Sequence, residues 1–283
     1  MRLSTEPSRN DDRAVALLHA AFDAGINFLD TADAYCWDAT EIGHNERLIA
    51  KALSTWNGDR SRIVVATKGG LTRPQGHWIP DGRARHLVQA CENSRKALGV
   101  ERIQLYQLHA LDRSTPLATS VRALESLKRD GLVEAIGLCN VNVGQIEEAR
   151  GITEISSVQV ELSPWHDESL LNGVAEYCAS NDITLFAHRP LGGLKGRGRI
   201  LSNKVLAAVA ARQQATPFEV VLAWLRDLSG NVVPVPGATR LETVASIARA
   251  QQIVLSNEDR ASLAERFPAG SRLRRNRRMA TWC

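Results

Sequence analysis

The feature that most constrains the fold of this chain is a regular alternation of two kinds of segment. Seven short runs, rich in β-branched and aliphatic residues, have the length and character of buried strands. Longer segments whose apolar residues recur with a helical period separate most of them. The runs cover residues 26–29, 63–66, 103–108, 133–138, 158–162, 183–187 and 232–235. Such an alternation is typical of an α/β protein with a parallel sheet.

Two of the intervening segments carry recognisable helix boundaries. Apolar residues between positions 17 and 22 follow an acidic first turn, and Gly25 is placed to end that helix. Thr216 and Glu219 have the spacing of a capping box, and Pro217 suits the first helical turn. These signals predict helices from about residue 11 to 24 and from residue 217 onward.

No linker, repeat or shift in composition divides the chain, so we expect one domain over residues 1–283. Seven strand–helix units in one domain favour a (β/α)8 TIM barrel over an open doubly wound sheet. An open dinucleotide-binding sheet would need a glycine-rich turn after its first strand, and the sequence LDTAD at residues 29–33 is no such turn. Only residues 1–4 remain to supply an eighth strand, so we expect the first barrel strand to be short or missing.

The composition excludes several classes of protein. With 44% hydrophobic and 23% charged residues, the chain is neither disordered nor a disulfide scaffold. No apolar stretch approaches the roughly 18 to 20 residues that a membrane helix needs, and the first twelve residues lack the apolar core of a signal peptide. Five scattered cysteines without a CxxC spacing are typical of reduced thiols. We therefore expect a cytoplasmic protein without a membrane partner.

The net charge of +4 is concentrated in a basic tail that begins at about residue 271. Its five arginines are Arg272, Arg274, Arg275, Arg277 and Arg278. Removing their charges from the net +4 leaves −1 for the rest of the chain, so the body is nearly neutral. We interpret the tail as a solvated end rather than a nucleic-acid contact. An interaction protein that binds polyanions through this tail is one alternative.

Polar side chains collect at the expected carboxyl ends of the strands, where barrels place their functional residues. These are Asp30, with Tyr35 just beyond it, Lys68 and His109. A cationic lysine lowers the pKa of a neighbouring tyrosine, and an aspartate keeps the lysine charged and oriented. A histidine within reach can donate a hydrogen bond to a substrate oxygen. The set suits proton donation to a carbonyl oxygen while hydride arrives at the carbon.

Competing chemistries have no comparable signal in the sequence. The histidines and cysteines show no metal-ligand spacing, so we expect no metal. Neither a GxSxG nucleophile elbow nor a phosphate-binding loop with its lysine is present.

A set of motifs in fixed order identifies a family resemblance. They are DAGINFLDTADAY (residues 23–35), GHNE (43–46), ATK (66–68), YQLH (106–109), IGLCN (136–140), VQVELS (158–163) and VPGATR (235–240). In this order they resemble the aldo-keto reductases, which are NAD(P)H-dependent (β/α)8 barrels. The resemblance runs from about residue 12 to about residue 255. It implies that the chain reduces a small-molecule carbonyl substrate.

The resemblance also assigns roles to individual residues. It places the family's catalytic tetrad on Asp30, Tyr35, Lys68 and His109. The cofactor-binding residues that it implies are Cys139, Asn140, Gln159, His188, Arg189, Leu191, Gly193, Gly237, Ala238, Thr239 and Arg240. Asn140 and Gln159 would hold the nicotinamide carboxamide, and His188 stands where an aromatic residue usually stacks. Residues 193–199 resemble the loop that clamps the pyrophosphate.

The turn at residues 237–240 bears on the choice of cofactor. Backbone amides at a helix start near Leu241, together with Thr239 and Arg240, suit an adenosine 2′-phosphate. The chain is therefore expected to use NADPH (NADP⁺) in preference to NADH, although Ser246 and Ile247 replace the family's usual Glu-Asn pair. For the substrate we expect His109 and Trp37 as contacts, Trp37 lying in a loop longer than the common one.

Two expectations concern the start of the chain and the rival function. Residues 1–4 look like the tail of the family's first strand, so we expect a clipped start. We interpret the chain as an enzyme for NADPH-dependent reduction of an aldehyde or ketone to an alcohol, with Tyr35 as general acid, assisted by Lys68, Asp30 and His109. The alternative is an NADPH-binding regulatory or redox-sensing barrel with little turnover.

Overall fold

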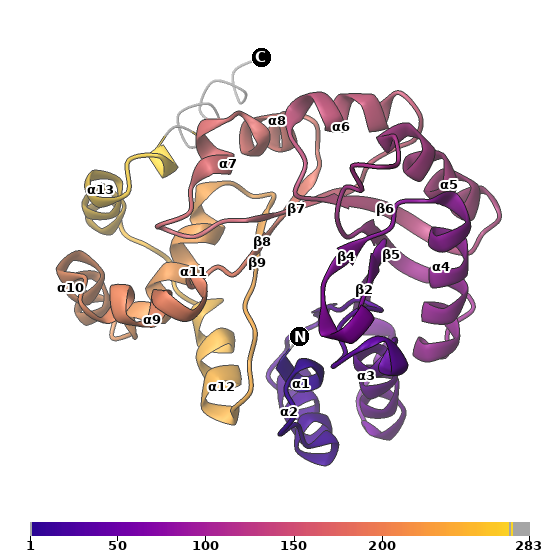
Figure 1. Ribbon diagram of the computed structural model, residues 1–283. Coiled ribbons are helices and arrows are strands. Elements are labelled where there is room, and N and C mark those ends of the chain that lie inside the picture. Colours follow the sequence, from indigo (N-terminus) through magenta and orange to yellow (C-terminus); the bar gives the residue numbers. More distant parts are fainter. Residues whose placement is uncertain (1, 272, 274–283) are drawn as a thin grey trace. The chain divides into compact units, whose positions relative to one another are not determined.

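The computed structural model describes residues 2–271 and 273, which form two compact units (Figure 1). The first unit comprises Met1–Ser156 with Thr239–Leu241, and the second comprises Ser157–Ala238 with Glu242–Cys283. The five arginines of the basic tail lie outside the described residues.

The first unit is built on four parallel strands that neighbour one another in chain order. They are β1 (Phe28–Asp30), β2 (Val64–Gly69), β5 (Ile103–Leu108) and β6 (Val133–Cys139). The helices are α1 (Arg2–Thr5), α2 (Asp11–Asp23), α3 (His44–Thr55), α4 (Ala84–Leu98), α5 (Leu117–Arg129) and α6 (Val143–Arg150), and β3 (Leu71–Thr72) pairs with β4 (Ile79–Pro80) in a short antiparallel hairpin. Helix α4 packs against β2, and α5 packs against β5 and β6 (Figure 1).

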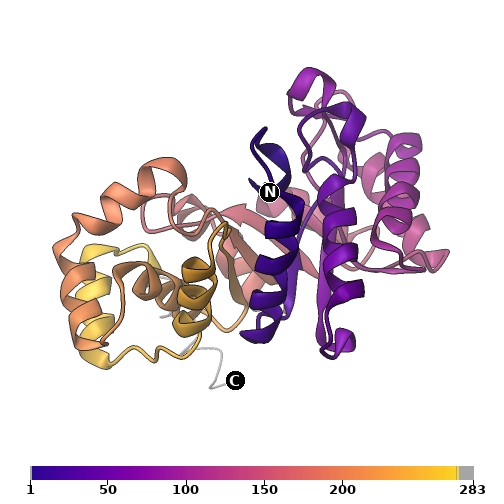
Figure 2. The same ribbon diagram turned by 90° about the horizontal axis from the view of Figure 1, so that it is seen from below.

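The helix signals of the sequence are confirmed in this unit. Helix α2 begins after Asn10, whose side chain accepts a hydrogen bond from the Arg13 amide, and it ends just before Gly25, which has a φ of +82°. Its apolar stripe packs against α3, and the two helices run side by side (Figure 2). The shared core contains Ala14, Leu18, Phe22, Leu48, Ile49 and Ala52.

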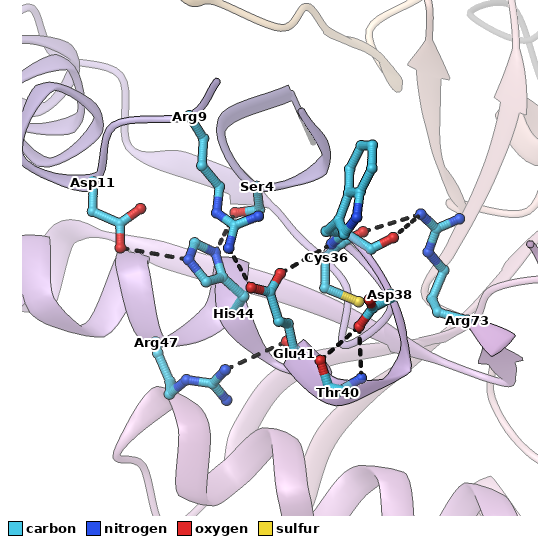
Figure 3. Close-up of polar contacts among 11 residues, drawn as sticks. Ser4, Arg9, Asp11, Cys36, Asp38, Thr40, Glu41, His44, Arg47 and Arg73 are labelled. Atoms are coloured by element: carbon cyan, nitrogen blue, oxygen red, sulfur yellow. Dashed lines mark hydrogen bonds and ion pairs between the residues drawn. The ribbon is translucent and has the colours of Figure 1, made fainter. Parts of the chain in front are cut away.

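The chain before α2 forms a helical turn where we expected part of a strand. Residues 2–5 form α1, and no strand precedes α2 among the described residues. Ser4 is fully buried, and its hydroxyl lies 2.9 Å from His44 Nδ1 (Figure 3). The same hydroxyl accepts a hydrogen bond from Asn45 Nδ2 at 2.8 Å. Leu3 packs against the core shared by α2 and α3. The side chains of Ser4 and Leu3 thus hold α1 against α3 and against the core shared by α2 and α3, without a partner strand.

The second unit contains three parallel strands in chain order, β7 (Ser157–Glu161), β8 (Thr184–His188) and β9 (Val232–Val235). Its helices are α7 (Glu168–Leu171), α8 (Val174–Ser180), α9 (Gly193–Leu201), α10 (Lys204–Arg212), α11 (Pro217–Leu228), α12 (Leu241–Ala250) and α13 (Asn257–Arg266). The predicted capping box at the start of α11 is confirmed: Thr216 accepts from the Glu219 amide, and Glu219 accepts from the Thr216 amide. Helices α10 and α13 lie side by side (Figure 2).

A buried carboxylate joins α10 to α13. Asp259 caps the start of α13 by accepting hydrogen bonds from the Ser256 amide and hydroxyl. It also accepts from Gln213 Nε2 at 2.6 Å and from Arg212 Nε at 2.8 Å. Burial would raise the pKa of Asp259, but these donors outweigh burial and lower it to about 2.

We expect Asp259→Asn to lower the free energy of unfolding by about 2 kcal/mol at neutral pH. The pKa is depressed in the folded state, so the carboxylate contributes its full stability above the ordinary value of 3.8. That contribution is lost as the pH falls from about 4 toward 2. Urea unfolding of the wild type and the variant between pH 2.5 and pH 7 measures it.

The control for this variant is Asp182→Asn, because Asp182 is exposed and lies outside the contact between α10 and α13. Its stability should follow the wild type at each pH. A stability difference between wild type and Asp259→Asn that stays constant down to pH 2.5 would contradict the assignment.

Candidate active site

The four parallel strands of the first unit bring the expected catalytic residues to one edge. Asp30 is the last residue of β1, Lys68 is the next to last of β2, and His109 directly follows β5. Parallel strands end at the same edge of a sheet, and the register pairs Asp30 with Ala66 and Lys68 with Gln107. Tyr35 stands in the loop that follows β1.

Lys68 is the centre of this cluster. Its side chain is only 1% exposed, and Nζ donates to Asp30 Oδ1 at 2.6 Å and to the Thr31 carbonyl at 2.8 Å. The same ammonium lies 3.4 Å from Tyr35 Oη and 5.0 Å from the centroid of the Tyr35 ring. All three donors of the ammonium therefore have a partner, one of them the candidate proton donor.

Charge pairing keeps Lys68 protonated despite its burial. Burial by itself would lower the pKa of the ammonium, but Asp30 and Tyr35 outweigh burial and raise that pKa above its ordinary value. A buried ion pair of this kind is costly to break from one side. The ion pair with Asp30 thus keeps the positively charged Lys68 ammonium beside the Tyr35 hydroxyl.

The pKa of Tyr35 differs from the sequence-based expectation. Burial raises this pKa to about 12, and the opposing effect of Lys68 is smaller. Lys68 lowers this pKa as expected, but burial, which the sequence does not show, outweighs its effect. Tyr35 is a neutral hydroxyl at neutral pH, and this is the form that can donate a proton.

An aromatic cluster surrounds the Tyr35 hydroxyl on its outer side. The Tyr35 and His109 rings meet edge to face with centroids 5.4 Å apart. Trp78, from the β3–β4 hairpin, lies 6.2 Å from Tyr35 and 6.4 Å from His109, also edge to face. Trp78 is 43% exposed, so it offers an apolar surface beside the candidate proton donor.

Sequence reasoning missed Trp78. Its signal was the turn-forming segment RPQGHWIPDG at residues 73–82, which has two prolines and two glycines soon after the strand that carries Lys68. Such a cluster indicates a hairpin or loop over the strand end. Trp37, the expected substrate contact, is 45% exposed in the loop after Tyr35.

Four of the expected cofactor-binding residues belong to the first unit. Cys139 ends β6 as a buried thiol, and burial raises its pKa to about 12. Asn140 follows in the left-handed region with a φ of +57° and is exposed. Thr239 and Arg240 are exposed and directly precede α12, which begins at Leu241 as predicted.

The second unit holds the remaining expected cofactor-binding residues. Gln159 is buried on β7, His188 is the last residue of β8, and Arg189 Nη1 lies 3.2 Å from Glu161 Oε2. Leu191 and Gly193 lie at the start of α9, and Gly237 and Ala238 follow β9.

Residues 193–199, which we expected to be a loop, belong to α9. The helix begins after Gly192, whose φ of +76° turns the chain out of β8. A Cβ on Gly196 would lie 1.6 Å from the Leu191 carbonyl oxygen, so only glycine allows this close approach. A helix start with exposed Lys195, Arg197 and Arg199 remains suited to phosphate oxygens.

Two other features are absent from the part of the chain that the structure describes. No group of three or more His, Cys, Asp or Glu side chains there is arranged to hold a metal ion. Within the same residues, no helix combines the length and apolar character needed to cross a membrane.

Comparison with known proteins places this geometry in a family. The profile described as "Aldo/keto reductase family" matches residues 1–266. The chain is 30% identical to "Probable aldo-keto reductase 1" of Glycine max, over 94% of this chain and 82% of that protein. It also resembles a thermostable aldo-keto reductase solved with the inhibitor epalrestat, with a TM-score of 0.78 and 29% identity over 93% of this chain and 90% of that one.

A second solved structure carries a nucleotide. It is an aldo/keto reductase from Klebsiella pneumoniae in complex with NADP and acetate, with a TM-score of 0.76 and 25% identity over 91% of this chain and 86% of that one. The predicted resemblance and barrel class are thus confirmed. Because these matches span nearly the whole chain, the protein belongs to the aldo/keto reductase family and is an oxidoreductase with the (β/α)8 class of fold.

Proposed function

We propose that this protein uses NADPH to reduce an aldehyde or ketone to an alcohol. We also propose that residues 1–283 act as a single domain. The observation that carries the proposal is the buried Lys68 ammonium, held between the Asp30 carboxylate and the Tyr35 hydroxyl. The NADP complex of the Klebsiella pneumoniae relative supports the cofactor. When bound, NADPH supplies the hydride that reduces the carbonyl carbon.

The residues of the first unit account for the proton. Tyr35 Oη donates its proton to the carbonyl oxygen as that oxygen becomes negative, and the phenolate that remains is stabilised by Lys68, 3.4 Å away. Asp30 keeps Lys68 charged and in place. His109 orients the substrate by a hydrogen bond to the same oxygen, and Trp37 contacts the rest of the substrate.

Each unit by itself carries residues that we propose contact NADPH. In the first unit, Asn140 binds the carboxamide beside Cys139, while Thr239 and Arg240 bind the 2′-phosphate. In the second unit, Gln159 binds the carboxamide and His188 packs on the nicotinamide. Arg189, Leu191 and Gly193 bind the pyrophosphate, and Gly237 and Ala238 shape the turn before α12. The tight backbone at Gly196 and the exposed cations of α9 fit the pyrophosphate.

The first test measures turnover and cofactor binding on one sample. Purified protein is mixed with NADPH and p-nitrobenzaldehyde, and the loss of NADPH absorbance is followed while the alcohol product is identified by mass spectrometry. NADPH carrying deuterium at the transferable position should give an alcohol with one deuterium on the former carbonyl carbon. A parallel titration follows NADPH fluorescence.

Turnover with deuterium transfer is the expected result. Tight NADPH binding without turnover of any of a panel of aromatic, aliphatic and keto substrates would instead favour the regulatory barrel. Absence of NADPH binding would contradict both functions.

A further inference from the structure

Arg73, in the turn after β3, is a buried cation that the proposed mechanism does not use. It is 5% exposed, and no Asp or Glu of the described residues forms an ion pair with it. Its Nη2 donates to the Cys36 carbonyl at 3.1 Å and to the Trp37 carbonyl at 2.9 Å (Figure 3). Within the described residues, Nε and Nη1 are buried without a hydrogen-bond partner. Burying a charge in this way is costly, so the contacts that it does make require explanation.

One of these contacts is with Trp78. The Arg73 guanidinium carbon lies 3.8 Å from the centroid of the Trp78 ring, which is stacking distance for a cation on an aromatic face. Trp78 in turn meets the edges of Tyr35 and His109. The rings of Trp78, Tyr35 and His109 form an aromatic wall at the candidate active site, and Arg73 supports this wall by stacking on Trp78.

The other contact is with the chain directly after Tyr35. Cys36 and Trp37 follow the candidate proton donor in sequence, and both of their carbonyls accept from the same nitrogen of Arg73. The loop is fixed further along by Glu41, which pairs with Arg9 and accepts from the Trp37 amide (Figure 3). Arg73 thus links the hairpin that carries Trp78 to the loop that carries Tyr35.

We propose that Arg73 is a positioning residue that sets the geometry and the specificity of the carbonyl-binding mouth. The flat face of its guanidinium stacks on the Trp78 ring. An N–H group at the edge of the same guanidinium donates to the carbonyls of the turn after Tyr35. A lysine cannot make both contacts, because only a planar guanidinium presents a flat face and in-plane donors at once. Substrates with an aromatic ring depend on this wall, whereas small aliphatic aldehydes reach Tyr35 without it. The proposal rests on the proposed reductase function.

The test compares Arg73→Met and Arg73→Lys with the wild type on two substrates, p-nitrobenzaldehyde and propanal. In Arg73→Met we expect kcat/KM for the aromatic aldehyde to fall about tenfold, mainly through KM. For propanal it should change less than about twofold, and NADPH affinity should be unchanged. Arg73→Lys, which keeps the charge, should recover only a small part of the loss.

The matched control is Arg83→Met, because the Arg83 side chain is 75% exposed and pairs with Asp81 outside the cluster. It should behave as the wild type on both substrates. Equal losses on both aldehydes in Arg73→Met would indicate general damage and overturn the proposal. Full recovery by Arg73→Lys would overturn the role of the flat guanidinium.

A double-mutant cycle tests the contact itself. With Trp78→Ala as background, Arg73→Met should cost much less for the aromatic aldehyde than it does in the wild type. Additive effects would contradict the proposal.

A readout independent of turnover separates this proposal from the proposed function. Near-ultraviolet circular dichroism of the wild type minus Trp78→Ala gives the signal of the Trp78 ring held in a fixed environment. That signal should be strongly reduced in Arg73→Met and retained in Arg83→Met. The wild type could reduce no carbonyl while the Arg73→Met variant still lost the Trp78 signal. In that case the reductase function would fail, and Arg73 would still position Trp78. A signal unchanged in Arg73→Met would overturn the positioning role whatever the activity.

Discussion

Replacing Tyr35 by phenylalanine should lower kcat/KM for carbonyl reduction about a thousandfold, within the range expected for loss of a general acid. The substitution removes a hydroxyl that lies 3.4 Å from the Lys68 ammonium, on a ring that meets the His109 ring edge to face. The ring stays in place against Trp78 and His109, so the free energy of unfolding should change by less than about 1 kcal/mol. Steady-state kinetics and NADPH titration of the variant measure both parts of the expectation.

The control for this variant is Tyr177→Phe, a half-buried tyrosine of α8 outside every candidate site. It should retain the activity of the wild type, and both variants should bind NADPH as the wild type does. Turnover by Tyr35→Phe within about tenfold of the wild type would show that another group donates the proton.

Replacing Lys68 by methionine should have the second large effect, on activity and stability together. The substitution leaves the Asp30 carboxylate without the ammonium that lies 2.6 Å away. It also removes the charge that opposes burial at Tyr35, so the pKa of Tyr35 should rise further. We expect kcat to fall about a thousandfold and the free energy of unfolding to fall by about 3 kcal/mol. Kinetics and urea unfolding check the two parts.

The double variant Asp30→Asn/Lys68→Met separates the two effects. It removes the unpaired carboxylate, so stability should recover substantially while activity stays low. Lys51→Met is the control, because Lys51 forms an exposed pair with Asp12 and should change little. A double variant no more stable than Lys68→Met would show that the ion pair does not explain the loss.

Much of the fold was predictable because strand identity is a local property of the chain. The boundaries of β5 and β9 agree with the predicted runs at residues 103–108 and 232–235, since each run is bounded by residues that do not continue it. The capping box of α11 was equally local, involving residues three apart. By contrast, residues 1–4 are too short for a pattern to distinguish a strand from a helical turn. The helical turn that begins at Arg2 depends on contacts of Ser4 with His44 and Asn45, about forty residues away.

The period of the apolar residues was enough to place Asp30, Lys68 and His109 at the ends of their strands. How these groups behave could be learned only from their surroundings in the folded protein. The pKa of Tyr35 is the balance between burial by many atoms and one nearby charge, and no sequence pattern shows which is larger. The role of Arg73 was hidden for the same reason: its carbonyl partners lie 36 and 37 residues away, and folding alone brings them to it.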